Sequence, residues 1–191
     1  TLSRGLGDVY KRQAVSGTPV AAMRFRKAIA EAGADLFFVQ ATVVSTNHIG
    51  PEGQDTLDLE ELCQGMGLPV VIGNCVTYEV ALQLMRAGAA GVMVGIGPGA
   101  ACTSRGVLGV GIPQATAVAD CAAARADFQK ESGRYVPIVA DGGIVTGGDI
   151  CKCIACGADA VMIGSPIARA DEAPGRGLSL IHISEPTRQS P

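Results

Sequence analysis

One junction recurs three times along this chain and constrains its fold more than any other feature. An amphipathic helical pattern stops at a glycine, and a short apolar run follows at once, at 32–39, 87–94 and 156–163. A glycine just past the last turn is a common way for a helix to end. Strands that are apolar on both faces are typical of a parallel sheet covered by helices. The pattern therefore predicts an α/β protein.

Two further apolar runs, at 68–72 and 136–140, bring the number of predicted strands to five. Helical patterns separate the strands, at 19–32, 57–66, 77–87, 113–131 and 148–155. Such units build either a doubly wound open sheet or a (β/α)8 barrel. The chain has no G-x-G-x-x-G turn with an acidic residue about 20 positions later, which argues against the dinucleotide-binding open sheet. We predict part of a (β/α)8 TIM barrel.

Composition limits the classes of function. The 191 residues carry a formal net charge of -3 without any lysine or arginine block, which argues against a nucleic-acid surface. No apolar run approaches the roughly 20 residues of a membrane helix. Seven cysteines in a long chain without a signal peptide indicate reduced thiols, so we expect a cytoplasmic protein. Cys151, Cys153 and Cys156 would spread around a helix, so we predict no metal site there.

The two ends of the chain differ from its middle. Residues 1–13 and 178–191 break the helix and strand patterning and resemble translated sequencing-adapter read-through. Ordinary irregular terminal segments are the alternative. We predict non-native flanks at 1–13 and 178–191 and a partial barrel domain at 14–177.

Polar residues and glycines follow the carboxyl end of every predicted strand, which is where barrel enzymes build their active sites. These segments are Gln40-Ala41-Thr42, Gly73-Asn74, the loop 95–105, Asp141-Gly142-Gly143 and Gly164-Ser165. Backbone N–H groups of the last two turns suit a phosphate, and Asp141 suits the hydroxyls of a sugar. Plain tight turns are the alternative for these glycines.

The loop after the third predicted strand places one cysteine, Cys102, at the end of the glycine-rich turn 95–101. Backbone N–H groups around a cysteine favour the thiolate, which is the nucleophilic form. Cys102 is therefore a candidate covalent catalyst, with a buried structural cysteine as the alternative. His48 and His182, the two histidines, lie away from the strand ends, which argues against a Cys-His or Ser-His-Asp pair.

Several motifs, taken in order, resemble one enzyme family. They are the Cys102 loop, Gly109-Val110-Gly111-Ile112-Pro113-Gln114, Ala140-Asp141-Gly142-Gly143-Ile144 and the run 157–165. Over residues 14–177 the chain is similar to the IMP dehydrogenase/GMP reductase family, and it resembles the bacterial IMP dehydrogenase-related subfamily that lacks regulatory CBS domains. On this resemblance the predicted strands correspond to strands 4 to 8 of a (β/α)8 barrel.

The resemblance implies that Cys102 attacks C2 of the purine of a nucleoside monophosphate (IMP, XMP or GMP), and that NAD or NADP exchanges hydride with that carbon. It implies an enzyme of purine and GMP biosynthesis whose intact parent is a cytoplasmic homotetramer. The resemblance assigns catalysis to Cys102 and Ser104, and cofactor binding to Gly73, Asn74 and Gly95. It assigns ribose binding to Asp141 and phosphate binding to Gly142, Gly143, Gly164 and Ser165. It also implies that the carbonyls of Gly97, Gly99 and Cys102 bind potassium.

Three departures from the family pattern leave the reaction open. Ala100 replaces a serine, Ser104 replaces the catalytic threonine, and Gln40-Ala41-Thr42 stands where the dehydrogenases have Asp-Ser-Ser. IMP dehydrogenase, GMP reductase, a non-catalytic nucleotide-binding barrel and a different phosphate-binding barrel enzyme remain as alternatives. Five strands do not close a barrel, and the family's mobile flap would lie beyond Gly177. We therefore expect the 191-residue chain itself to be inactive.

Overall fold

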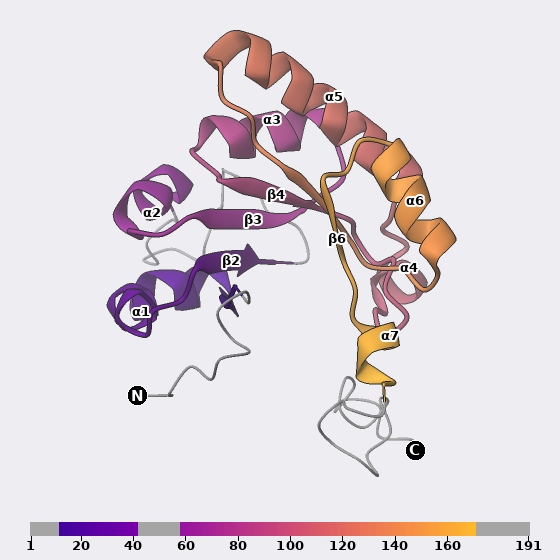
Figure 1. Ribbon diagram of the computed structural model, residues 1–191, viewed down its shortest axis with the longest axis horizontal. Helices are drawn as coiled ribbons and strands as arrows, with labels where there is room; N and C mark the ends of the chain where they lie inside the picture. Colours follow the sequence, from indigo (N-terminus) through magenta and orange to yellow (C-terminus); the bar gives the residue numbers. More distant parts are fainter. Residues whose placement is uncertain (1–11, 42–57, 171–191) are drawn as a thin grey trace.

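The computed structural model describes residues 12–41 and 58–170, which form a curled parallel sheet with helices around its outer face (Figure 1). The strands lie side by side in sequence order, each parallel to its neighbours. They are β1 (Ala14–Gly17), β2 (Leu36–Gln40), β3 (Val70–Cys75), β4 (Gly91–Val94), β5 (Ile138–Asp141) and β6 (Ala160–Met162). Parallel strands in sequence order, linked by helices on the outside, are the repeating unit of a (β/α)8 barrel, so the predicted fold class is confirmed.

Helices connect the strands, and several begin at a side chain that accepts a hydrogen bond from the first turn. The helices are α1 (Pro19–Glu31), α2 (Leu59–Gly65), α3 (Tyr78–Arg86), α4 (Ser104–Leu108), α5 (Gln114–Ser132), α6 (Gly147–Ala155) and α7 (Ser165–Ala168). The capping side chains are Thr18, Asp58, Thr77 and Thr146. Such caps satisfy backbone N–H groups that have no partner within the helix, and so they determine where each helix starts.

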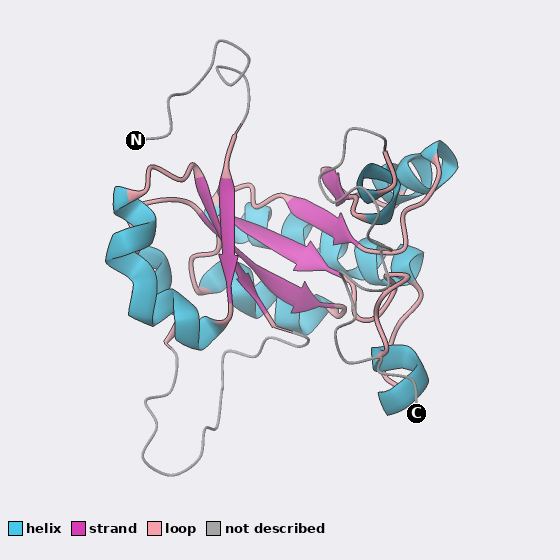
Figure 2. Ribbon diagram, turned by 90° about the horizontal axis from the view of Figure 1, so that it is seen from below, coloured by secondary structure: helices cyan, strands magenta, loops and turns pink. Residues whose placement is uncertain are grey.

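The core lies between the sheet and its helices. β3 and β4 are buried along their whole length, and α3 packs against α5. Ile72 of β3, Leu84 of α3 and Val118 of α5 are completely buried in this layer. Burying one such side chain contributes about 1.5–3 kcal/mol. The strands fan out from this core in Figure 2, and their carboxyl ends lie along one edge because all of them are parallel.

Residues 12–41 and 58–170 form one strand more than the five that the sequence predicts. β1 has the sequence Ala-Val-Ser-Gly and is mostly exposed, so it lacks the apolar run that marks the other strands. It nevertheless pairs with β2, from Ala14 opposite Leu36 to Gly17 opposite Val39. The sheet therefore extends one strand further toward the N-terminus than predicted. The short helices α4 and α7 were also missed, because four or five residues do not establish a helical period.

The three cysteines of the 151–156 cluster lie in different environments. Cys151 is exposed, Cys153 is buried and Cys156 is half-buried. Within residues 12–41 and 58–170, no three His, Cys, Asp or Glu side chains are grouped so that they could hold a metal ion. In the same part of the chain, no helix combines the length and the apolar character that crossing a membrane requires.

Candidate active site

A cavity of about 560 Å³ lies at the carboxyl ends of the strands. Its volume falls within the roughly 300–1,000 Å³ typical of ligand sites. The wall is built from the carboxyl ends of β1 to β5 and the segments that follow them: Thr18, Gln40, Ala41, Asn74, Gly95, Ile96, Gly97, Pro98, Gly99, Cys102, Ser104, Asp141 and Gly142. Segments far apart in the sequence thus converge on one concave surface, at the end of the barrel where the polar strand-end residues were predicted to meet.

Cys102 is exposed on the wall of this cavity. Its Sγ lies 3.4 Å from Oγ of Ser104, the first residue of α4. The N–H of Cys102 donates to the carbonyl of Gly99 at 3.0 Å, which closes the turn that presents the thiol. The structure therefore brings the two predicted catalytic residues together, with a hydroxyl that can accept or donate a proton beside the thiol.

The buried cysteines of the core offer a contrast to Cys102. Cys75 and Cys121 lie with their sulfur atoms 4.0 Å apart in the core. The hydrogen bond with Cys121 and burial raise the pKa of Cys75, and burial raises the pKa of Cys63 to about 11. Thiols with raised pKa values stay protonated and are poor nucleophiles at neutral pH. The Cys102 side chain lies in a different place, exposed on the wall of the cavity.

Gly95 sets how closely the segments after β4 and β5 approach each other. Its φ is 141°, and a Cβ built there would overlap the carbonyl oxygen of Asp141 and lie 2.9 Å from Oε1 of Gln114. A residue with a side chain would therefore push the two strand ends apart. Gly95, which the resemblance places beside a cofactor, lines the cavity and allows the close approach of the two strand ends.

Asn74 links three strand ends through its side chain. Its Nδ2 donates to the carbonyl of Gly95 and to Oδ2 of Asp141, both at 2.8 Å. Asn74 is 8% exposed and is the one buried polar residue among the described residues. A buried amide with both donors satisfied is a rigid support. It orients the Asp141 carboxylate, which the resemblance places near a ribose.

Gln114 was not predicted as a site residue. It begins α5, and its Nε2 donates to the carbonyl of Val94 at 2.7 Å and to that of Asp141 at 3.3 Å. The Gln114 side chain thereby links the backbone of β4 to the backbone of β5. Asn74 makes a second link, from the end of β3 to the Gly95 carbonyl and the Asp141 carboxylate. Its position in the quoted run 109–114 was the available signal, but nothing in a linear motif indicates which backbone groups an amide will reach.

The turn after β5 packs directly on the loop that carries Cys102. Gly142 and Gly143 have φ values of 89° and 74°, where side chains are strained. A Cβ on Gly142 would lie 2.9 Å from Cγ of Pro98, and a Cβ on Gly143 would lie 3.0 Å from the carbonyl oxygen of Pro98. The two glycines therefore support the Cys102 loop by contact, and Gly142 also lines the cavity.

The remaining predicted residues occupy three kinds of place. Gly97 and Gly99 line the cavity with Gly142, whereas Gly143, Gly164 and Ser165 do not. Gly73 is buried in β3, where a Cβ would lie 2.5 Å from Cβ of Met93. Thr42, His48 and His182 lie outside the described residues. Thr18 and Gln40 line the cavity without having been singled out as binding residues.

Known proteins match this chain in sequence. The family model described as "IMP dehydrogenase / GMP reductase domain" matches residues 9–182. An uncharacterized oxidoreductase of Mycobacterium tuberculosis is 45% identical over 166 residues, which are 86% of this chain and 44% of the relative. An inosine-5'-monophosphate dehydrogenase of Haemophilus influenzae is 46% identical over 148 residues, which are 78% of this chain and 28% of the relative.

A solved structure matches in three dimensions. The crystal structure of an IMP dehydrogenase/GMP reductase-like protein from Corynebacterium glutamicum superposes with a TM-score of 0.78 and 43% sequence identity, covering 87% of this chain and 43% of that chain. The chain thus spans less than half the length of the relatives it matches. Since the family model covers most of its residues and the fold is shared, the chain belongs to the IMP dehydrogenase/GMP reductase family.

Proposed function

We propose that this chain is part of an oxidoreductase that acts on C2 of a purine nucleoside monophosphate, of the IMP dehydrogenase type, with Cys102 as the nucleophile. The observation that carries the proposal is an exposed Cys102 thiol, beside the Ser104 hydroxyl, on the wall of a cavity that also contains Asp141. A thiolate is the strongest nucleophile among protein side chains near neutral pH, so its position defines where a substrate carbon must sit.

The proposed step begins when the Cys102 sulfur bonds to C2 of IMP, after the thiol has lost its proton. Ser104 is 3.4 Å from that sulfur and is the group we assign to exchanging this proton with solvent or substrate. The new C–S bond keeps C2 next to the cavity wall, and C2 would then lose its hydrogen as hydride, for which a bound nicotinamide cofactor would supply the acceptor. Later attack by water on C2 would release XMP and return the electrons of the C–S bond to sulfur. Asp141, held by Asn74, accepts hydrogen bonds from the ribose hydroxyls in this proposal.

Phosphate and cofactor positions follow from the cavity wall. Gly142 lines the cavity and Gly143 adjoins it, so their backbone can approach a 5′-phosphate without side-chain obstruction, and we assign Gly164 and Ser165 to the same phosphate from the next strand end. Asn74 and Gly95 line the cavity, which fits a nicotinamide ring packed against them, with Gly73 supporting them from within β3. When bound, NAD or NADP supplies the acceptor or donor of hydride.

A potassium ion fits the carbonyls of Gly97, Gly99 and Cys102 by ligand type. Hard cations prefer oxygen ligands, and backbone carbonyls have two lone pairs. The Gly99 carbonyl accepts the Cys102 N–H at 3.0 Å, which leaves a lone pair for a cation. We propose that the ion, when bound, stabilises the turn that presents Cys102.

GMP reduction is the second candidate function, and one observation favours it. Gln40 lines the cavity at the end of β2, where the dehydrogenases carry an aspartate on the resemblance described above. Loss of that carboxylate removes a hydrogen-bond acceptor for a cofactor ribose and a negative charge that would oppose a 2′-phosphate. In this reading the same Cys102 bonds to C2 of GMP and ammonia leaves from that carbon, and NADPH, when bound, would supply the hydride that C2 gains as the C–S bond breaks and IMP is released.

The active enzyme is, in our proposal, a longer cytoplasmic chain that forms a homotetramer, which we call the complete enzyme. Within the described residues the sheet has six strands, whose two outer members each have one edge without a partner strand there, and closing a barrel of this type takes eight strands. We expect the 191-residue chain alone to be inactive and to associate through those edges. Activity of the monomeric 191-residue chain equal to that of the complete enzyme would contradict this part of the proposal.

The test is an assay of the complete enzyme with IMP plus NAD and with GMP plus NADPH, together with mass spectrometry of the protein during turnover. The expected result is turnover in one assay and a nucleotide mass added to the peptide that contains Cys102. Cys151, which is exposed on α6, serves as the internal control and is expected to stay unmodified. Turnover that persists without any adduct and without Cys102 would exclude the covalent mechanism.

A further inference from the structure

The side chain of Arg105 joins the two ends of the segment that carries Cys102. Arg105 lies in the first turn of α4, three residues after Cys102. Its Nε donates to the carbonyl of Ile96 at 3.2 Å, and its Nη2 donates to the carbonyl of Ile112 at 2.6 Å. Residues 97–111, which we call the Cys102 segment, lie between these two carbonyls. One side chain therefore connects the points where the segment leaves the core and returns to it.

Both of these points are fixed by the core. Ile96 is 4% exposed and belongs to the main cluster of buried residues, and the partly buried Ile112 packs against that cluster. Residues between them are largely exposed, including Cys102 and the apolar side chains of Val107 and Leu108. The segment therefore has anchored ends and a middle with few buried contacts, which is the pattern of a segment that opens locally unless it is cross-linked.

Two glycines make room for the Arg105 side chain. A Cβ on Gly97 would lie 2.8 Å from Cγ of Arg105, and a Cβ on Gly111 would lie 2.7 Å from its Nε. The Arg105 side chain therefore passes close to the backbone of Gly97, at one end of the segment, and of Gly111, at the other end. Alanine at either position would displace the guanidinium from its carbonyl acceptors. The position of Arg105 therefore favours glycine at Gly111, and at Gly97 it does so together with a φ of 72°.

We propose that Arg105 is a positioning residue, which holds the Cys102 segment closed so that the thiol keeps its place on the cavity wall. The planar guanidinium suits this task because two of its N–H groups point at two carbonyls in fixed directions, whereas a lysine ammonium is a single point donor on a flexible stem. Arg105 acts through Cys102 and Ser104, which it neighbours in sequence, and touches no reacting atom. This inference rests on the proposed nucleophilic role of Cys102.

The experiment compares Arg105→Gln, Arg105→Lys and Arg24→Gln in the complete enzyme. Arg24 is an exposed arginine of α1 that contacts Phe25, so its substitution removes the same charge far from the segment. Hydrogen–deuterium exchange reports opening of residues 97–111, and steady-state kinetics separates kcat from KM. Arg105→Gln is expected to exchange about tenfold faster in this segment and not elsewhere, because two cross-links are lost from a weakly packed region.

The kinetic expectation is a fall in kcat of about 10- to 100-fold with KM for the nucleotide changed less than about threefold, because misplacing a nucleophile affects the chemical step more than binding. Arg105→Lys should recover part of the lost kcat, and Arg24→Gln should match the unsubstituted enzyme in both measurements. Thermal unfolding of each variant identifies any that fail to fold. If Arg105→Gln does not fold, the same two measurements on Arg105→Lys decide the question.

Unchanged exchange in residues 97–111 of a folded Arg105 variant would overturn the inference, whatever the activity. An equal loss of kcat and of nucleotide affinity, with exchange raised throughout the protein, would also overturn it in favour of a general structural role. Failure of the proposed function has a different signature. In that case Cys102→Ala would leave turnover intact, while the exchange of the Cys102 segment would still respond to Arg105→Gln.

Discussion

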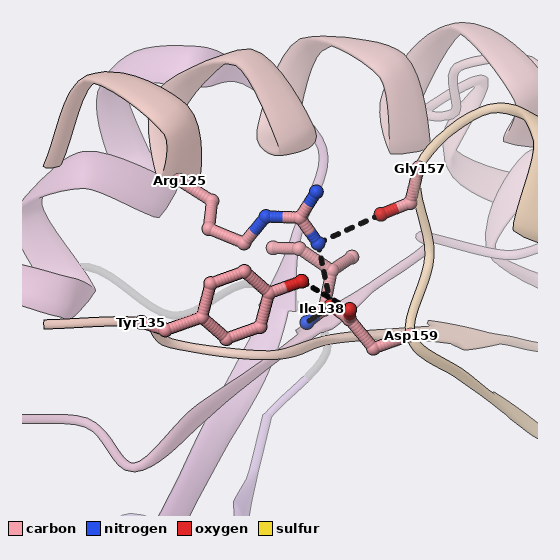
Figure 3. A network of polar contacts seen from close by, with 5 residues as sticks. All are labelled: Arg125, Tyr135, Ile138, Gly157 and Asp159. Carbon is pink, nitrogen blue, oxygen red and sulfur yellow. Dashed lines mark hydrogen bonds and ion pairs between the residues drawn. The ribbon is translucent and has the colours of Figure 1, made fainter. Parts of the chain in front are cut away.

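The two ends of the parallel strands are built in opposite ways. At the amino ends of β5 and β6, side chains converge on the Asp159 carboxylate. It accepts hydrogen bonds from Nη1 of Arg125 at 2.5 Å, from the N–H of Ile138 at 2.8 Å and from the hydroxyl of Tyr135. Figure 3 shows these groups together, with Arg125 also donating to the carbonyl of Gly157 at 2.9 Å.

At the carboxyl ends, glycines take the place of such side chains. Gly95, Gly142 and Gly143 let backbone segments touch, and the polar side chains of Asn74 and Gln114 donate to the strand ends behind the cavity. Cys102 is left exposed on the surface that results. The amino end therefore fixes the strands to each other, and the carboxyl end leaves room for a ligand. Substitutions should change mainly stability at the first end, whereas at the second end they should change activity, together with stability where a glycine has a positive φ.

The largest effect is expected for Cys102→Ala. In the complete enzyme it should lower turnover more than about 1,000-fold, because the nucleophile of the chemical step is removed, while nucleotide affinity changes less than about tenfold. The midpoint of urea unfolding should not change, since the side chain is exposed. Cys151→Ala is the matched control and should leave both turnover and stability unchanged. A loss of stability in Cys102→Ala would contradict the expectation that this residue at the carboxyl ends of the strands affects activity alone.

Asp159→Ala should have the largest effect on stability. The Arg125 and Asp159 side chains are only 16% and 28% exposed, so removing the carboxylate breaks a partly buried ion pair and leaves the N–H of Ile138 without its acceptor, while Arg125 keeps only the carbonyl of Gly157. The expected loss is about 2–3 kcal/mol in the free energy of unfolding, measured by urea denaturation.

The control is Glu131→Ala, which removes the exposed ion pair with Arg86 and should cost less than about 1 kcal/mol. The reaction of Cys102 with a thiol reagent should be the same in both folded variants. A changed thiol reactivity in Asp159→Ala would show that the two ends of the strands are coupled.

Gly143→Ala should affect both stability and activity, because it adds a contact as well as backbone strain. Its φ is 74°, close to the 72° of Gly133 at the end of α5, but only Gly143 has Pro98 within reach of a new Cβ. Gly143→Ala and the matched control Gly133→Ala are both expected to lose about 1–2 kcal/mol of stability, because alanine is strained at a positive φ. Only Gly143→Ala should also weaken nucleotide binding, measured by calorimetry on the complete enzyme. Equal nucleotide binding by the two variants would show that the Pro98 contact is unimportant.

The smallest effect is expected from pH at the start of α6. Hydrogen bonds from Lys152 and Thr146 hold the pKa of Asp149 well below its usual value. A group whose pKa is lower in the folded state stabilises the protein above its unfolded pKa, near 3.9 for aspartate, and that contribution is lost as pH falls toward the folded value.

The difference in urea midpoint between the unsubstituted protein and Asp149→Asn should therefore be present at about pH 5 and shrink toward about pH 3. Asparagine keeps an oxygen that can accept from Thr146, so the comparison isolates the charge. A difference that stays constant over this range would show that the charge of Asp149 contributes nothing to stability.

Much of the fold could be predicted from local patterns. The five apolar strands and the main helices between them were predicted close to where the structure has them, and the family resemblance assigned the barrel. β1 was not predicted because only one of its four residues, Val15, is a large apolar residue, so its sequence shows neither alternation nor an apolar run. It is a strand because its backbone pairs with β2, and pairing of that kind depends on the rest of the sheet.

The candidate site was predictable as a set of strand ends and only partly as a set of contacts. The sequence by itself determined that Asn74, Cys102 and Asp141 lie at or beyond the carboxyl ends of strands, because strand ends are marked by apolar runs that stop at glycine and polar residues. Only the tertiary structure decided that Asn74 donates to Asp141, 67 positions away, and that Gln114 reaches the end of β4, 20 positions before it. The register and curl of the sheet place these groups together, and both result from packing the whole core, which no local pattern along the chain specifies.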